Sequence, residues 1–324
     1  MRENFGGAGA GTGVGAQPQR EKTRPDMTVD IAGVKLKNPV MTASGTFGSG
    51  MEYAEFIDLN RLGAVVTKGV AAEPWEGNPT PRVAEVTSGM LNAIGLQNPG
   101  IDVFLERDLP FLKAYDTKVI VNVCGHTEQE YLEVVQKLQE APVDLLEINV
   151  SCPNVTRGAI QFGQDPACLE DITAKIKKAA AQPVIMKLTP NVTDIAVMAR
   201  AAEAGGADAV SLINTITGMK IDIETQRFVL ANKTGGMSGP AIKPIAVRMV
   251  WQAAQAVSIP VIGMGGIASA EDAVEFMLAG ASAVAVGAMN FHDPYLTVKI
   301  ADGIEEYLIR HGIGDVKELT GAVR

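Results

Sequence analysis

A cysteine in a polar setting is the first residue in this chain with the means to do chemistry. Cys152 lies in the run Asn149 to Asn154 (NVSCPN), which follows an apolar segment and opens a long polar connection. A thiol in such a place can act as a nucleophile or as a base if a nearby positive charge lowers its pKa. Most free cysteines are small buried hydrophobes, and we interpret Cys124 and Cys168, which lack this polar setting, as structural or incidental. The polar neighbours of Cys152 favour a functional role.

Two lysines each end an apolar run. Lys68 follows Val65-Val66-Thr67, and Lys187 follows Val184-Ile185-Met186. A lysine buried there needs an anion or another acceptor, so each can be half of a salt bridge. Either can also be a Schiff-base amine, as in barrel aldolases. A pair of them suits a flavin site better, because positive charge stabilises the N1–C2=O2 edge of the reduced ring.

Glycines follow the last two apolar runs of the chain. The first group is Gly263-Met264-Gly265-Gly266, and the second is Val286-Gly287-Ala288. The loops after strands 7 and 8 of an α/β barrel frequently bind phosphate, and glycine lets the phosphate approach the backbone closely. The pair therefore predicts a phosphate group without identifying the molecule that carries it.

Asparagines end three other apolar runs, at Asn122, Asn149 and Asn214. A buried amide must find partners, and a heterocycle with amide and carbonyl edges would both donate to it and accept from it. The segment 92–98, which begins with Asn92, can close over such a ligand or form an ordinary omega loop. The three cysteines are widely spaced and form no CxxC pair, so the sequence does not indicate a zinc or iron–sulfur site. We predict no metal.

Alternating strand-like and helix-like segments must position these side chains. Continuous apolar strands between helices indicate a parallel sheet covered on both faces, and eight such units predict a closed (β/α)8 TIM barrel. The expected strands are 39–44, 64–70, 118–123, 145–150, 183–188, 209–214, 259–264 and 283–287. The stretches of helical periodicity between them include 128–139, 166–180, 194–204, 242–256 and 270–278. An open doubly wound sheet is the alternative, but no phosphate fingerprint follows the first strand.

Several connections and the N-terminal segment stand outside this pattern. We expect a hairpin at 29–36 that seals the bottom of the barrel, and long insertions at 71–100, 151–165 and 216–239 on its C-terminal face. Barrel enzymes place their chemistry at that face. Residues 1–26 are rich in glycine and predict a flexible tail, which leaves 27–324 as one catalytic domain.

Composition excludes several classes of protein. The 324 residues carry a formal net charge of −9, and only 5% are aromatic, which argues against a nucleic-acid binder. The sequence contains neither an apolar run long enough to cross a bilayer nor a signal-peptide core. We therefore expect a cytoplasmic protein that binds neither membranes nor nucleic acids.

These motifs together resemble the class 1 dihydroorotate dehydrogenases. The resemblance runs from about Met27 to the C-terminus. The matching segments are 43–48 (ASGTFG), 67–69 (TKG), 92–98, 149–154, 187–190 (KLTP), 213–215 (INT), 235–240 (GGMSGP) and the two glycine groups. The resemblance implies an oxidoreductase of pyrimidine (UMP) biosynthesis that binds one FMN per chain and converts dihydroorotate to orotate.

The resemblance also implies roles for individual residues. Cys152 would be the catalytic base that takes the proton from C5, while the hydride leaves C6 for the flavin. The implied FMN contacts are Ser44, Lys68, Gly69, Asn122, Asn149, Lys187, Ile213, Gly239, Gly265, Gly266, Gly287 and Ala288. The implied substrate contacts are Lys68, Asn92, Ala93, Ile94, Gly95, Leu96, Asn149, Asn214 and Thr215. The membrane-bound class 2 enzymes differ, with serine in place of Cys152 and an N-terminal membrane-associating segment.

Within class 1, the segments 189–194 (TPNVTD) and 236–240 are similar to the NAD-linked subclass 1B. That similarity implies a partner subunit with FAD and a [2Fe–2S] cluster, typically as a heterotetramer of two copies of each chain. Three alternatives stay open: a fumarate-linked class 1A enzyme without a partner, a Schiff-base aldolase that uses Lys68 or Lys187, and a subunit that binds flavin without turning it over.

Overall fold

The computed structural model describes residues 24–150 and 159–324. The glycine-rich start of the chain and the predicted base Cys152 lie outside these residues. Inside them, eight parallel strands close into a barrel, as predicted. The strands in the order of their pairing are β3 (Val40–Thr42), β4 (Ala64–Val66), β7 (Lys118–Val123), β8 (Leu145–Asn149), β9 (Val184–Lys187), β10 (Ala209–Leu212), β15 (Val261–Met264) and β16 (Ala283–Val286).

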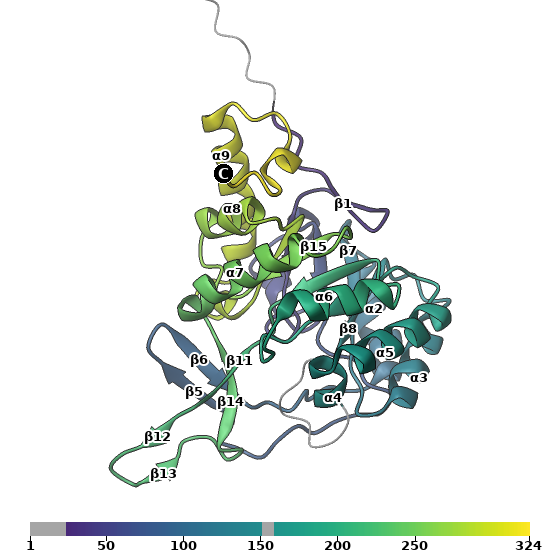
Figure 1. Cartoon of the computed structure of the whole chain (residues 1–324), viewed down its shortest axis with the longest axis vertical. Helices are drawn as coiled ribbons and strands as arrows, with labels where there is room; N and C mark the ends of the chain where they lie inside the picture. Colours follow the sequence, from purple (N-terminus) through teal and green to yellow (C-terminus); the bar gives the residue numbers. More distant parts are fainter. Residues whose placement is uncertain (1–23, 151–158) are drawn as a thin grey trace, which may run out of the picture.

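Helices surround the barrel, with α7, α8 and α9 on one side and α3 and α5 on the other (Figure 1). Because both faces of each strand are covered, nearly every barrel-strand residue is buried, which explains their continuous apolar runs. The helices of six or more residues are α3 (Glu128–Leu138), α4 (Ala159–Gln164), α5 (Pro166–Ala179), α6 (Ile195–Ala204), α7 (Lys243–Ala254), α8 (Ala270–Leu278) and α9 (Leu296–His311).

Side-chain caps explain where several of these helices begin. Thr127, Asp165, Asp194 and Ser269 each accept a hydrogen bond from a backbone N–H in the first turn of the following helix. The shorter helical segments are η1 (Tyr53–Glu55), η2 (Leu59–Arg61), α1 (Ile101–Val103), the π-helical turn η3 (Phe104–Asp108), α2 (Leu109–Leu112), η4 (Pro240–Ile242), η5 (Ala288–Phe291) and η6 (Val316–Leu319).

The predicted hairpin forms at the N-terminal end of the barrel. Strands β1 (Val29–Ile31) and β2 (Val34–Leu36) pair antiparallel, and Ala32-Gly33 makes the turn between them. Ile31 and Leu36 are fully buried in the main core. The hairpin precedes β3, so these side chains cover the end of the barrel opposite to the C-terminal ends of the strands.

Two of the long insertions pair with each other, which the sequence did not reveal. Strands β5 (Val83–Val86) and β6 (Gly89–Asn92) from one insertion join β11 (Ile216–Met219) and β14 (Thr234–Ser238) from the other in an antiparallel sheet. The strands β12 (Ile221–Asp222) and β13 (Arg227–Phe228) extend from it as an arm that projects from the barrel (Figure 1). The sheet therefore links insertions that follow β4 and β10.

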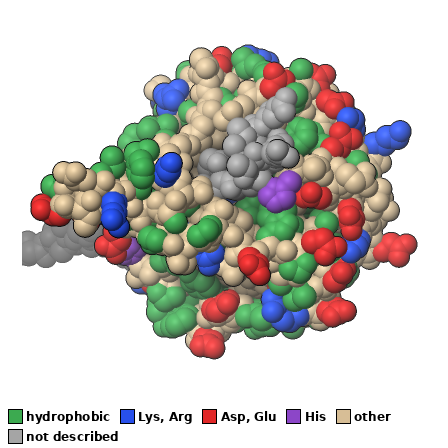
Figure 2. Space-filling view, turned by 90° about the horizontal axis from the view of Figure 1, so that it is seen from below, with side chains coloured by type: hydrophobic (Ala, Val, Ile, Leu, Met, Phe, Trp, Pro, Cys, Tyr) green, Lys and Arg blue, Asp and Glu red, His purple; other side chains and the backbone are tan. Residues whose placement is uncertain are grey.

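The start of the described chain is attached to its end. The backbone N–H of Asp26 donates to the carbonyl of Gly314, and the N–H of Val316 donates to the carbonyl of Asp26. Among the described residues, no helix has both the length and the apolar character needed to cross a membrane. On the face seen in Figure 2, acidic and basic side chains are interspersed, with the Lys and Arg residues lying singly or in small groups.

Candidate active site at the mouth of the barrel

A cavity of about 330 Å³ lies at the C-terminal ends of the barrel strands. Its volume is in the range of small-molecule sites. Every barrel strand contributes to its wall, either from its last residues or from the loop that follows. One lining residue for each strand, taken in chain order, is Ser44, Lys68, Asn122, Asn149, Lys187, Ile213, Gly265 and Gly287.

The structure brings the predicted site residues together. All twelve residues predicted to contact FMN line this one cavity. Of the predicted substrate contacts, Ala93 alone is not in the lining, because its side chain is buried in the small core beneath the four-stranded sheet. Cys152 is outside the described residues, although Asn149, three positions earlier, lines the cavity.

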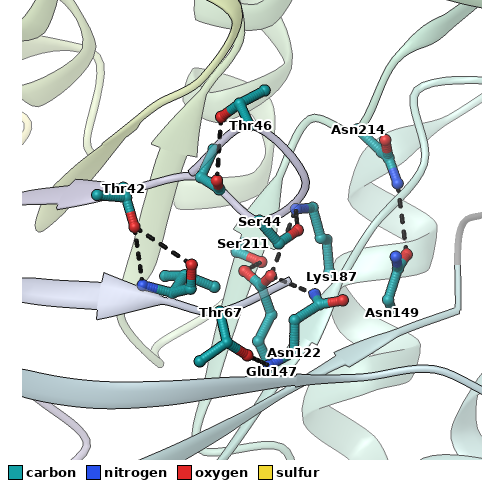
Figure 3. A network of polar contacts seen from close by, with 12 residues as sticks. Thr42, Ser44, Thr46, Thr67, Asn122, Glu147, Asn149, Lys187, Ser211 and Asn214 are labelled. Carbon is teal, nitrogen blue, oxygen red and sulfur yellow. Dashed lines mark hydrogen bonds and ion pairs between the residues drawn. The ribbon is translucent and has the colours of Figure 1, made fainter. Parts of the chain in front are cut away.

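A buried ion pair lies at the floor of the cavity, where Lys187 is a lining residue and Glu147 lies behind it (Figure 3). Lys187, at the end of β9, places its Nζ 3.3 Å from Oε1 of Glu147 on β8, and both side chains are at most 5% exposed. The same Oε1 accepts a hydrogen bond of 2.6 Å from Nδ2 of Asn122 on β7. The Oε2 atom accepts one of 2.8 Å from Ser211 on β10. Glu147 thus joins four neighbouring strands, and the salt-bridge interpretation of Lys187 is confirmed.

Glu147 is a site residue that sequence reasoning missed. It interrupts the apolar run Leu145-Leu146-Glu147-Ile148, and a covered parallel strand offers a carboxylate no water on either face. Like Lys68 and Lys187, this glutamate needs a polar partner if it is buried among apolar strand residues. A glutamate within this apolar run was therefore the sequence signal that could have indicated a buried polar network.

Two features of this floor face the ligand space. Lys187 also donates a hydrogen bond of 2.9 Å to Oγ of Ser44, which follows β3. Asn122 is fully buried, and its Oδ1 has no hydrogen-bond partner among the described residues. Because Glu147 holds the amide nitrogen, Oδ1 is left to accept a hydrogen bond from a ligand.

The asparagines that end β8 and follow β10 lie side by side. Nδ2 of Asn214 is 3.4 Å from Oδ1 of Asn149, and Oδ1 of Asn214 accepts the N–H of Thr215 at 2.7 Å. Tyr131 on α3 donates its hydroxyl hydrogen to the carbonyl of Asn149 at 2.8 Å. These bonds hold two amide groups at the cavity wall, where a planar polar ligand can exchange hydrogen bonds with them.

The glycine turn after β15 is packed tightly against backbone. Gly265 and Gly266 have φ of +122° and +84°, values that favour glycine. A Cβ on Gly266 would lie 2.8 Å from the backbone nitrogen of Lys243. The side chain of Lys243 bonds to Asp272 and Glu275 on α8, and these hydrogen bonds raise its pKa. The turn, α7 and α8 are therefore held together.

Apolar residues at the rim were not predicted. Val83 and Met90 come from the four-stranded sheet, and Met289 and Phe291 come from η5. They belong to segments whose side chains meet only in the folded chain, so no spacing in the sequence indicated them. The described residues contain no group of His, Cys, Asp and Glu that could hold a metal ion.

Fold and site together define a class of protein: a (β/α)8 barrel with a polar, lysine-bearing ligand cavity at the C-terminal mouth. Comparison with known proteins narrows this class. The family model described as dihydroorotate dehydrogenase matches residues 26–308. The chain belongs to the dihydroorotate dehydrogenase family, which confirms the resemblance drawn from its motifs.

Individual relatives agree with the subclass that the motifs indicated. The chain is 67% identical to a protein of Lachnoclostridium phytofermentans named "Dihydroorotate dehydrogenase B (NAD(+)), catalytic subunit", over 91% of this chain and 99% of that protein. A protein of Alkaliphilus metalliredigens with the same name is 61% identical, over 93% of this chain and 100% of its own length. A crystal structure of DHODH from Eimeria tenella, in complex with ferulenol, has a TM-score of 0.78 at 22% identity. The match covers 96% of this chain and 91% of that one, and supports the fold.

Proposed function

We propose that this chain is the catalytic subunit of an NAD-linked dihydroorotate dehydrogenase, which oxidises dihydroorotate to orotate at the cavity described above. One observation carries the proposal: a single cavity gathers both strand-end lysines, the strand-end asparagines and both glycine turns from around the barrel. The names of the 61–67% identical relatives support the choice of substrate and subclass.

The residues of the cavity fit FMN. Gly265, Gly266, Gly287 and Ala288 would hold the phosphate, and at Gly266 a Cβ would meet backbone atoms at 2.8 and 2.9 Å. The buried Oδ1 of Asn122 lacks a donor among the described residues, and a flavin ring can supply one. When bound, FMN supplies the two-electron acceptor that the side chains of a protein cannot provide.

The remaining residues would bind and orient the substrate. We assign this role to Lys68, Asn92, Ile94, Gly95, Leu96, Asn149, Asn214 and Thr215, all of which line the cavity. Lysine ammonium groups neutralise a carboxylate, and the paired amides of Asn149 and Asn214 match the edge of a cyclic amide. The sheet that carries Asn92 lines one part of the cavity and would limit the access of water on that side.

Cys152 is our candidate for the base that takes the proton from C5 of the substrate. The assignment rests on the motif 149–154, because Cys152 lies outside the described residues. A thiolate is a far better base near neutral pH than a serine hydroxyl, which explains the choice of residue chemically.

We also propose that electrons leave through a partner subunit. The printed names "catalytic subunit" and "NAD(+)" of the relatives support a second chain and NAD as the final acceptor. FAD and a [2Fe–2S] cluster on that partner, a heterotetramer of two copies of each chain and a cytoplasmic location are predictions from the resemblance.

The visible spectrum of the purified chain tests the proposal. We expect a yellow protein whose flavin absorbance bleaches rapidly when dihydroorotate is added without oxygen. A chain that takes up no flavin even from excess FMN would contradict the proposal. Mixing the chain alone with dihydroorotate and fumarate tests the class 1A alternative, since rapid turnover without a partner would favour it.

A further inference from the structure

The ion pair under the cavity is unusual for the interior of a small barrel. Such interiors are filled mainly by layers of branched apolar side chains. Replacing a buried ion pair by apolar residues is often neutral or stabilising, so the pair is weak evidence for a contribution to stability. Glu147 nevertheless occupies the centre of β8 with 2% exposure and three bonded partners. This arrangement suggests a role at the site.

Glu147 decides which polar atoms of the floor are offered to a ligand. By accepting Nδ2 of Asn122, it turns Oδ1 of that amide into an acceptor without a partner among the described residues. Oδ1 would lie 3.3 Å from a Cβ placed on Gly69, another lining residue, so it points toward the wall of the cavity. The carboxylate also places a negative charge 3.3 Å behind the ammonium of Lys187.

We propose that Glu147 is a positioning residue that sets the polarity of the cavity floor and the reduction potential of the bound flavin. It holds Lys187 and Asn122 in place and partly offsets the positive charge of Lys187. The inference rests on the proposed function, because it assumes that FMN lies over this floor. Positive charge near the ring favours the anionic reduced flavin, so a counter-charge behind Lys187 lowers the potential.

The variant Glu147→Gln tests this, because it removes the charge and keeps the side-chain volume. We expect the holoprotein to bind reduced FMN more tightly relative to oxidised FMN by about tenfold, which is a rise of ~30 mV for a two-electron couple. Equilibrium dye titration measures the potential, and fluorescence titration of FMN measures its affinity. A folded Glu147→Gln holoprotein with an unchanged or lower potential would overturn the inference.

Two matched variants separate charge from packing. Ser211→Ala removes one hydrogen bond to the same carboxylate but keeps its charge, so the potential should stay near that of the wild type. Asp108→Asn removes another buried carboxylate, bonded to Ser49 and Arg107 and outside the cavity lining, and should also leave the potential unchanged. An equal shift in either variant would show a general structural effect and overturn the inference.

If Glu147→Gln does not fold, Glu147→Asp keeps the test decisive. The shorter side chain withdraws the carboxylate from Lys187, so a smaller rise in potential is expected, and a wild-type potential would contradict the inference. The two proposals also fail differently. A wild-type chain that binds no flavin contradicts the proposed function, whereas a flavin-bearing wild type with no shift in these variants contradicts only the role of Glu147.

Discussion

Gly266 is the residue whose replacement should damage the cofactor site most directly. Its φ is +84°, and a Cβ would lie 2.8 Å from the nitrogen of Lys243 and 2.9 Å from the carbonyl oxygen of Gly239. Both are backbone atoms, so the turn itself must move. We expect Gly266→Ala to weaken FMN binding about tenfold or more, since the phosphate would lose part of its backbone cradle. Titration with FMN, followed by flavin fluorescence, measures the loss.

Gly33 provides the matched control. It has the same φ of +84°, but a Cβ there meets nothing within 4 Å. Gly33→Ala should therefore cost only the strain of a left-handed backbone, about 1–2 kcal/mol, and leave FMN affinity unchanged. Equal losses of FMN affinity in the two variants would show that backbone strain, not close approach at the cavity, governs the effect.

Substitutions at Cys152 and at a second cysteine, Cys168, test the proposed base. Cys152→Ala should keep the fold and the flavin but reduce the flavin far more slowly on addition of dihydroorotate, because the thiol proposed to take the C5 proton is gone. Cys152→Ser should be intermediate at best and poorest near neutral pH. The control is Cys168→Ala, at a half-buried cysteine in the first turn of α5. Dihydroorotate should reduce the flavin of this variant at the wild-type rate. Anaerobic stopped-flow absorbance gives the rates, and a normal rate in Cys152→Ala would remove this residue as the base.

Residue chemistry explains which side chains the sequence revealed. Lys187 and Asn122 were recognisable because a polar group at the end of an apolar strand needs a partner. The partner itself, Glu147, required knowledge of which strands are neighbours. Ala93, which directly follows β6, was predicted to contact the substrate, because the motif alone did not indicate that its side chain would pack into the small core.

At the scale of the element, the start of α8 depends on one hydroxyl. Ser269 has extended backbone geometry, and its Oγ accepts the N–H of Asp272 at 3.2 Å. Ser269→Ala should lower the free energy of unfolding by about 1 kcal/mol, because one N–H of the first turn loses its acceptor. Denaturant titration measures the change. Ser269→Asn keeps a capping oxygen and should cost much less, so an equal loss in both variants would argue against capping as the cause.

Elements with a clear period were predictable, and those made by distant pairing were not. The amphipathic helices α5 and α8 matched their expected ranges to within one residue. By contrast, the four-stranded sheet pairs Asn92 with Gly236, which are far apart in the chain, and its short strands show no regular alternation. The stretch 101–112 was also missed, because a π-helical turn and Pro110 break its helical period.

At the scale of the whole molecule, closure of the barrel makes one cavity out of eight strand ends. Eight alternating units predicted that closure, because each apolar strand needs two neighbours and a covering helix. Alternation cannot specify that two long insertions pair in one sheet beside the cavity, or that Glu147 joins four neighbouring strands behind it. The cavity therefore exists only when the complete barrel is closed, so ligand binding and global stability are coupled.

That coupling gives a test on the intact chain. Because residues at the C-terminal ends of all eight strands line the site, FMN should bind the native state and not the unfolded chain. At 100 times its dissociation constant, FMN should stabilise the fold by about 2.7 kcal/mol, which raises the midpoint of thermal unfolding by several degrees. Riboflavin offers the same ring without the phosphate, so at equal concentration it should raise the midpoint far less if the glycine turns hold the phosphate. Equal stabilisation by the two ligands in differential scanning calorimetry would contradict the phosphate assignment of Gly265, Gly266 and Gly287 while leaving the ring site intact.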